Sequence, residues 1–183
     1  MFFKLVNHET QIRILEERDA PELFALVDQS RSYLRQWLPF VDSTENVEVV
    51  RKFIQTGLQR YAANNGAEFG IWYQGAFAGV IGLQSIDWEA RSTTIGYWIG
   101  EHFQGNGIMT NTCITLFNFL FRDYGLNRIE IEVAPQNLKS KAGVTRLGLS
   151  FEGRKKEALR LDDQYVDVDA YAMLSKDWLV RDI

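Results

Sequence analysis

The stretch TTIGYWIGEHFQGNGIMTNTCITLFNFLF, residues 93–121, contains the features that decide the fold of this chain. It opens with an apolar run, TTIGYWI (93–99), that is typical of a buried β-strand. It continues into an apolar segment from about residue 108 to 124 that is typical of a helix, and Gly125 follows as a left-handed stop. Between the two runs stands QGNG (104–107), so two glycines lie at the junction of a strand and a helix.

A helix that begins directly after glycines is suited to bind phosphate. Its first four backbone N–H groups have no partner within the helix, and the aligned peptide dipoles favour a nearby anion by about 0.3–2 kcal/mol. Glycines permit positive φ and remove the Cβ atoms that would keep an anion away. The pattern predicts a pyrophosphate site, with a simple tight turn as the alternative. It is no dinucleotide fingerprint, because Thr110 stands where that motif needs a third glycine.

The rest of the chain alternates between helical and strand periodicity, which predicts an α/β (α+β) domain around one mixed central sheet. We expect about seven strands, at residues 11–17, 67–73, 76–86, 93–99, 128–134, 150–161 and 165–174. We expect about four main helices, at residues 19–29, 44–63, 108–124 and 137–148, with a short helical segment over 30–42 that ends near Pro39.

Length and composition restrict the possible classes of protein. A chain of 183 residues with a net charge of −4 predicts one soluble domain, residues 1–183, and makes a nucleic-acid-binding protein a poor interpretation. The single cysteine, Cys113, excludes an internal disulfide and suits the reducing cytoplasm. No apolar run is long enough for a signal peptide or a membrane span. We therefore expect a cytoplasmic protein without a membrane partner.

Two motifs carry a resemblance to a known family. The run IGYWIGEHFQGNGIMT (95–110), followed by NLKSKAGVTRLGLSFEG (137–153), resembles the GNAT acetyltransferases. More narrowly, it is similar to the RimJ/RimL-type branch, whose members acetylate the N-termini of ribosomal proteins. The resemblance covers the chain from QIRILEERDAPELF (11–24) to VDAYAML (168–174). It implies a GNAT domain whose sheet is splayed near the cofactor, acetyl-CoA as co-substrate, no metal, and room for a homodimer.

The resemblance also implies which residues bind the cofactor. The pantetheine arm would pair with the main chain of residues 97–99, the pyrophosphate with the amides of residues 104–110, and the second motif with the thioester end. His102 stands where the family pattern has Gln or Arg, which removes one side-chain contact. Lys141 would meet a cofactor phosphate. The expected set is Tyr97, Trp98, Ile99, Gln104, Gly105, Asn106, Gly107, Ile108, Met109, Thr110, Asn137, Ser140 and Lys141.

The leaving CoA thiolate needs a proton donor. Many GNAT enzymes carry a tyrosine four residues before the glycine of the second motif, where this chain has Val144. Ser140 resembles the serine proposed for that role in the ribosomal branch, and capping of its own helix is the equally weighted alternative. Asn137 is expected beside the thioester end as the third catalytic candidate, after Ser140 and the base.

The attacking amine needs a base, and the sequence identifies one only loosely. Relatives often carry an acid before the Ile-Gly-Tyr-Trp motif, where this chain has Thr94. Glu68 is the first candidate, because a carboxylate within an apolar strand usually has a function. The other candidates are Asp87, Glu89, Glu130 and Glu132. For each carboxylate alone, a solvated or ion-paired role is the simpler interpretation.

The acceptor is the least determined part. Tyr33, Trp37 and Phe40 are candidates for an acceptor pocket, with local core or a dimer contact as alternatives. The predicted reaction is acetyl transfer to a protein N-terminus, whose pKa of about 7.7–8.0 leaves part of the amine neutral. A small amine such as a polyamine, an amino sugar or an antibiotic is the first rival acceptor. A non-catalytic acyl-CoA-binding module is the second rival interpretation.

Overall fold

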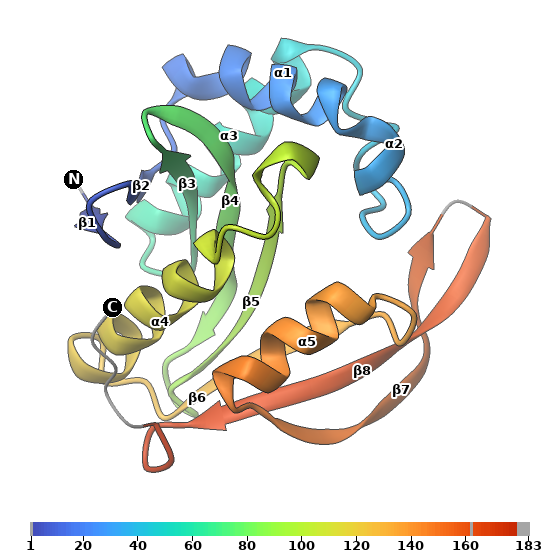
Figure 1. Cartoon of the computed structure of the whole chain (residues 1–183). Helices are drawn as coiled ribbons and strands as arrows, with labels where there is room; N and C mark the ends of the chain where they lie inside the picture. Colours follow the sequence, from blue (N-terminus) through green and yellow to red (C-terminus); the bar gives the residue numbers. More distant parts are fainter. Residues whose placement is uncertain (1, 162, 179–183) are drawn as a thin grey trace.

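The structure is a computed structural model that describes residues 2–161 and 163–178. One eight-stranded sheet runs through it in the order β1-β2-β3-β4-β5-β6-β8-β7 (Figure 1). The strands are β1 (Phe3–Leu5), β2 (Thr10–Ile14), β3 (Ala67–Tyr73), β4 (Ala76–Asp87), β5 (Ser92–Ile99), β6 (Arg128–Val133), β7 (Ser150–Leu161) and β8 (Gln164–Leu174). The helices are α1 (Ala20–Gln29), α2 (Arg31–Leu34), α3 (Val47–Ala62), α4 (Ile108–Arg122) and α5 (Leu138–Leu147), with 3₁₀ turns η1 (Glu17–Asp19) and η2 (Glu101–Phe103).

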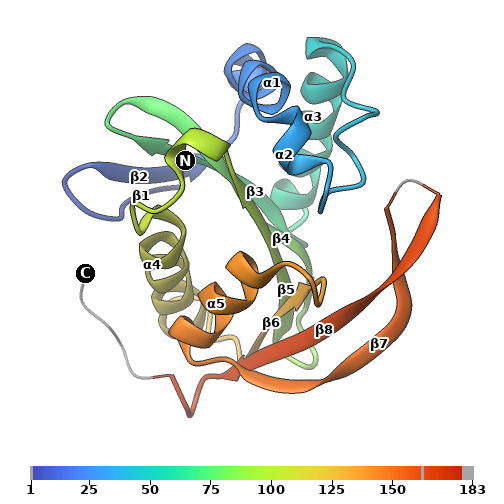
Figure 2. The ribbon, with the colours of Figure 1, turned by 45° about the vertical axis from the view of Figure 1, so that its right-hand side comes forward.

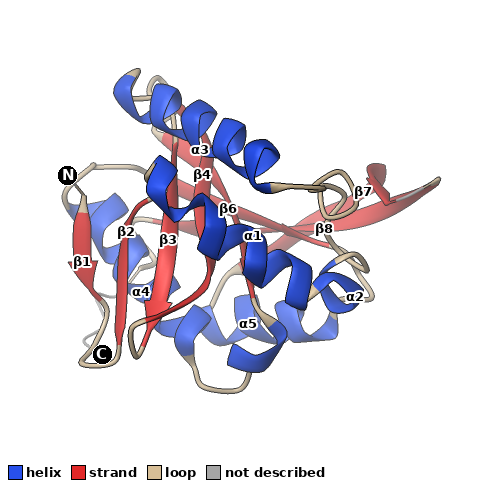
Figure 3. Ribbon diagram, turned by 90° about the horizontal axis from the view of Figure 1, so that it is seen from above, coloured by secondary structure: helices blue, strands red, loops and turns tan. Residues whose placement is uncertain are grey.

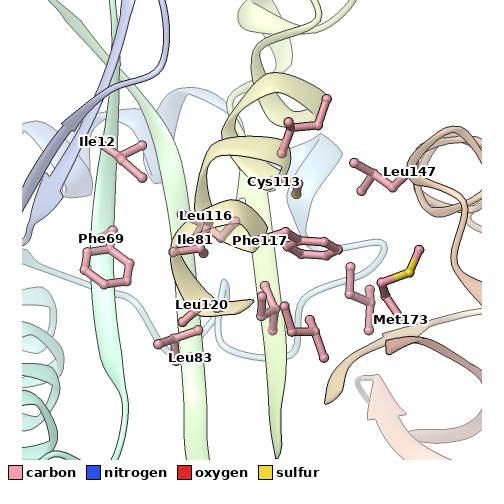
Figure 4. Close-up of a cluster of buried hydrophobic side chains, with 14 of the residues drawn as sticks. Ile12, Phe69, Ile81, Leu83, Cys113, Leu116, Phe117, Leu120, Leu147 and Met173 are labelled. Carbon is pink, nitrogen blue, oxygen red and sulfur yellow. The ribbon is translucent and has the colours of Figure 1, made fainter. Parts of the chain in front are cut away.

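Helices cover both faces of the sheet, with α1 and α3 on one side and α4 and α5 on the other (Figure 3). The face beneath α4 holds the larger core cluster, whose members include Phe69 and Ile81 of the strands and Phe117 of α4 (Figure 4). The smaller cluster joins α1 and α3 to the opposite face of β3 and β4. Alternate residues of each central strand therefore face different helices.

Cys113 belongs to the larger core cluster, as the sequence predicts. Its side chain is 1% exposed, and burial raises the pKa of the thiol to about 12. A thiol of this kind stays protonated at neutral pH and behaves as a small apolar group.

The secondary structure differs from the sequence expectation in three places. Strand β1 is an eighth strand, too short and too irregular in pattern to be recognised in the sequence. The segment 30–42 is helical only over α2, and beyond it Arg31 donates hydrogen bonds to the carbonyls of Val41 and Thr44, which hold the chain in turns. Helix α3 begins at Val47 rather than near residue 44, because the side chain of Asn46 caps it.

The sheet opens between β5 and β6. These two strands are parallel and pair at three positions, from Ser92 with Arg128 to Thr94 with Glu130. Residues 95–99 of β5 have no register partner on β6, although the same residues remain paired with β4 on the other side. A parallel pair needs a crossover, and α4 supplies it. The last part of β5 therefore forms one lip of a gap in the sheet.

Strands β7 and β8 form a long hairpin that arches away from the helices (Figure 2). Its register shifts twice, between Phe151 and Gly153 and between Lys155 and Leu159, and such bulges bend a strand. The hairpin thus extends the sheet past the gap. Among the described residues, no helix has the length and hydropathy needed to cross a bilayer.

Candidate active site

A cavity of about 790 Å³ lies where the sheet opens, between β5, the starts of α4 and α5, and the α2 region. Small-molecule sites commonly have about 300–1,000 Å³, so the cavity is large enough for a cofactor. Its lining comprises Tyr33, Leu34, Trp37, Leu38, Tyr97, Trp98, Ile99, Phe103, Gln104, Gly105, Gly107, Ile108, Met109, Thr110, Asn111, Cys113, Asn137, Lys139, Ser140, Ala142, Gly143, Arg146 and Leu147.

The start of α4 has the properties of an anion site. Gly105 and Gly107 have φ values of +80° and +71°, and a Cβ added at Gly105 would meet no heavy atom within 4 Å. Gly107 is the N-cap residue, and no side chain caps the helix. The amides of Ile108, Met109 and Thr110 therefore lie at an open helix end. These observations fit a bound pyrophosphate group.

Two cationic side chains of α5 line the same cavity. Lys139 Nζ donates to Gln104 Oε1 over 2.6 Å, and Arg146 Nη1 donates to Thr110 Oγ1 over 3.0 Å. The sequence interpretation had selected Lys141, which instead lies outside the cavity lining. Helical spacing carries the missing signal, since positions 139, 143 and 146 share one face and 141 does not.

The start of α5 brings two hydroxyl groups together. Asn137 is the N-cap, and its Oδ1 accepts a hydrogen bond from the Ser140 amide over 3.1 Å. The Ser140 hydroxyl instead lies 3.3 Å from the hydroxyl of Tyr97 on β5. Gly143 lies beside this pair, and a Cβ there would be in ordinary van der Waals contact with the Tyr97 hydroxyl, at 3.6 Å. Burial raises the pKa of Tyr97, so its hydroxyl stays protonated.

Helix α5 carries no tyrosine, and the tyrosine hydroxyl that lies beside it comes from β5. Val144 is fully buried in the core cluster, and Tyr97 places its hydroxyl beside the same helix. The sequence analysis had assigned only the main chain of Tyr97 a role. Its side chain could have been assigned from alternation, because Ile95, Tyr97 and Ile99 share the face that α4 covers.

The comparisons with known proteins agree with this geometry. A family model described as an acetyltransferase (GNAT) domain matches residues 10–150, which include β5, α4 and α5. The chain belongs to the GNAT acetyltransferase family. It is therefore an acyltransferase of the N-acetyltransferase type.

Relatives match this GNAT chain along nearly its whole length. YdaF of Bacillus subtilis (strain 168) is 36% identical over 97% of this chain and 98% of its own. The ribosomal-protein-serine acetyltransferase of Escherichia coli (strain K12) is 27% identical over 92% of this chain and 94% of its own. A solved structure of RimL, a ribosomal L7/L12 α-N-protein acetyltransferase in complex with CoA, has a TM-score of 0.91 at 28% identity, covering 94% of this chain and 98% of that one.

The remaining predicted residues of the GNAT site occupy different positions. Tyr33 and Trp37 line the cavity. Phe40 does not, and its ring lies 6.3 Å from that of Trp98 while its side chain is partly exposed. Asn106 also lies outside the lining, where its side chain donates to the carbonyls of Phe103 and Gln104.

Glu68 lies outside the cavity, on the sheet face that α3 covers. Its carboxylate accepts a hydrogen bond from Arg60 over 2.5 Å, and its side chain is 12% exposed. Burial raises the pKa of Glu68, and the pairing with Arg60 offsets part of that rise. Glu68 therefore lies on the α3 side of the sheet and outside the cavity lining, whose β5 residues include Tyr97 on the α4 face and Trp98 on the α3 face.

The other candidate carboxylates have structural partners. Glu130 accepts from Arg128, Glu132 pairs with Lys155, and Asp87 accepts from two amides of its own turn. The ion-paired interpretation therefore describes Glu130 and Glu132. Glu89 lies exposed in that turn.

A buried carboxylate connects α5 to the hairpin. Asp169 of β8 is 1% exposed and accepts from Arg154 Nε over 2.7 Å and from Lys141 Nζ over 3.0 Å. Arg154, and then Lys141, lower the pKa of Asp169. Lys141 and Arg154 are thus tied to Asp169. This network fixes the helix that carries Ser140.

We expect Asp169→Asn to destabilise the protein by about 1–3 kcal/mol at pH 7, because two cations lose a shared buried partner. The pKa of Asp169 is lower in the folded state than in the unfolded state. Its contribution to the free energy of unfolding is therefore complete above the unfolded-state pKa of about 3.9, and it is lost as the pH falls through the folded-state pKa. Urea unfolding at pH 7 and pH 3 should show a difference from the parent that shrinks in acid.

Asp163→Asn is the matched control, because Asp163 pairs with Arg160 at a side-chain exposure of 99%. It should leave the free energy of unfolding unchanged. Equal stability of Asp169→Asn and the parent at pH 7 would contradict the assigned role of the network.

Proposed function

We propose that this enzyme transfers the acetyl group of acetyl-CoA to the α-amino group of a protein N-terminus, by direct attack of the amine. The likeness over nearly the whole chain to enzymes that act on ribosomal proteins carries the proposal. A further solved structure, 29% identical, is of an enzyme from Salmonella typhimurium that modifies the N-terminal serine of ribosomal protein L7/L12. The chemistry agrees, because an α-amine with a pKa of about 7.7–8.0 is partly neutral at physiological pH.

The cofactor site follows from the cavity. The amides at residues 108–110 and the cations Lys139 and Arg146 would hold the phosphates, and the main chain of residues 97–99 offers unpaired strand groups to the pantetheine arm. When bound, acetyl-CoA supplies the thioester carbonyl that the acceptor amine attacks. The apolar lining from Trp37 and Leu38 would exclude water from that point.

Ser140 is the group best placed to donate a proton on the cavity side. Its hydroxyl is free of helix capping, since Asn137 accepts from its amide, and the Tyr97 hydroxyl lies within hydrogen-bond distance. Tyr97 can orient the Ser140 hydroxyl and return a proton to it. Asn137 then acts by fixing the first turn of α5 rather than by touching a reacting atom.

Glu68, on the α3 side of the sheet, is proposed as the base, acting through water. Because burial raises its pKa, Glu68 takes up a proton at a higher pH than an ordinary glutamate with a pKa of about 4.3. The base works only when ionised, so kcat should fall on the acid side, and Glu68→Gln should remove that fall and lower kcat. The measurement is kcat at saturating acceptor, because the free amine also titrates in kcat/KM.

Glu130→Gln provides the control for this pH experiment, since Glu130 is an ion-paired carboxylate on the neighbouring part of the sheet. Its pH profile should match that of the parent. A Glu68→Gln profile that coincides with the parent's would remove Glu68 from the mechanism.

The function itself is tested by CoA release from acetyl-CoA with a panel of acceptors. The panel holds peptides that begin with Ser or Ala, a lysine peptide with a blocked N-terminus, spermidine and an aminoglycoside. Turnover confined to the peptides with free N-termini is the expected result. Turnover on spermidine or the aminoglycoside alone would overturn the proposed acceptor, and binding of acetyl-CoA without any turnover would indicate a binding module.

A further inference from the structure

A row of three aligned residues crosses the sheet face that α3 covers. Glu68 of β3 is in register with Gly82 of β4, and Gly82 is in register with Gly96 of β5. The next strand on that side would be β6, but its pairing with β5 ends at Thr94. The row therefore runs from the Glu68 carboxylate to the edge of the gap, and its last two members have no side chain.

The direction of these positions follows from their neighbours. Ile81, Leu83 and Ile95 belong to the core cluster beneath α4, so Gly82 and Gly96 face the opposite side. A Cβ at Gly82 would collide with the Glu68 carboxylate. The space over Gly82 is thus filled by the Glu68 carboxylate, and Gly96 is the next position in the row toward the gap.

One side chain, that of Gln84, lies close to Gly96. A Cβ built at Gly96 would lie 3.4 Å from Gln84 Nε2 and would meet no other heavy atom within 4 Å. The register of β4 against β5 shifts between Leu83 and Ile86, so Gln84 lies in an irregular stretch of the ladder. Such irregularities occur next to active sites, where they re-aim a side chain. Here the shift directs a carboxamide toward the place where the sheet opens.

We propose that Gln84 and Gly96, next to the Glu68 carboxylate that lies over Gly82, form the binding site of the acceptor amine, here called the acceptor seat. The inference rests on the proposed function and names the residue that orients its acceptor. A carboxamide offers one acceptor oxygen and two N–H donors, which suit an amine and the first peptide group behind it. With no side chain at Gly96, the amine can lie against the strand at the gap, across from the Ser140 side. Trp98, two residues along the same face of β5, lines the cavity next to this position.

The seat has a simpler structural interpretation that predicts different measurements. If Gly82 served only to make room for the Glu68–Arg60 pair and Gly96 only to make room for Gln84, changes there would affect stability alone. If they form the acceptor seat, the KM for the acceptor should rise while the affinity for acetyl-CoA stays the same. Gly82→Ala is unsuitable, because its Cβ would displace a buried carboxylate.

The test therefore uses Gln84→Ala and Gly96→Ala, with Gln55→Ala as the matched control on the exposed side of α3. With a Ser-initiated peptide, we expect both seat variants to raise the acceptor KM about tenfold, which corresponds to about 1.4 kcal/mol. The dissociation constant of acetyl-CoA and the melting temperature should match the parent, and Gln55→Ala should match it in every respect. An acceptor KM within twofold of the parent in both seat variants would overturn the inference.

Failure of the proposed function would be seen separately. If the parent acetylates spermidine and no peptide, the assigned acceptor is wrong, and the same variants are then measured with spermidine. A tenfold rise in the KM for spermidine would still support the seat, because the seat would bind an amine in either case. An unchanged KM for spermidine would overturn it.

Discussion

Gly107→Asp is expected to abolish detectable acetyl-CoA binding, with a loss of affinity of about a hundredfold or more. Gly107 has a φ of +71° and directly precedes the amides that open α4. A carboxylate at this point would neutralise the positive end of the helix dipole and repel a bound phosphate. A hundredfold loss corresponds to about 2.8 kcal/mol, which isothermal titration calorimetry measures directly.

Two further variants separate charge from backbone strain. Gly107→Asn has nearly the same shape without the charge and should lose much less affinity. Gly75→Asp places the same carboxylate at a φ of +82° in the turn between β3 and β4, with no heavy atom within 4 Å of its Cβ, and should bind as the parent does. Parent-like affinity in Gly107→Asp would mean that the cofactor phosphates lie elsewhere.

Ser140→Ala is expected to lower kcat about a hundredfold and to change the KM for acetyl-CoA little. General acid catalysis commonly contributes about 10²–10⁴ in rate, and a proton donor that acts only as the thiolate leaves affects the transition state rather than the bound substrates. Steady-state kinetics at saturating acceptor would show the fall in kcat together with a nearly unchanged KM for acetyl-CoA. The helix should remain intact, because Asn137 caps it through the amide of residue 140.

Thr145→Ala is the control on the same helix, since it removes a hydroxyl that donates only to the carbonyl of Lys141. Its kcat should equal that of the parent. The kcat of Tyr97→Phe should lie between that of Ser140→Ala and that of the parent, because this change removes the hydroxyl partner of Ser140 but leaves the serine in place. A Ser140→Ala enzyme with the parent's kcat would reduce Ser140 to an ordinary residue of the first turn.

The sequence predicts those parts of the site that depend on local pattern. The strand ending at Ile99, the glycines at 105 and 107, and the helix that follows are all consecutive, so their arrangement needs no knowledge of distant residues. The Asn137 cap is predicted for the same reason, because the cap and the amide it binds lie three residues apart.

Side chains whose roles depend on packing were harder to predict. Which cation of α5 faces the cavity depends on how that helix docks, and the docking is fixed by the contact of Lys141 with Asp169, 28 residues later. Asp19 occupies the N-cap position of α1, as expected, but its carboxylate accepts from Arg13 instead of capping the helix. A single sequence gives no measure of such long-range pairing.

The uncapped start of α4 also has a thermodynamic consequence. Gly107 at the N-cap costs α4 roughly a few tenths of a kcal/mol relative to a capping side chain and leaves the first amides of the helix open to an anion. Any anion bound there acts as a removable cap, and its concentration enters the folding equilibrium by mass action. At a hundredfold excess over the dissociation constant, that linkage amounts to about 2.7 kcal/mol. If acetyl-CoA binds there as proposed, its concentration should raise the melting temperature of the protein.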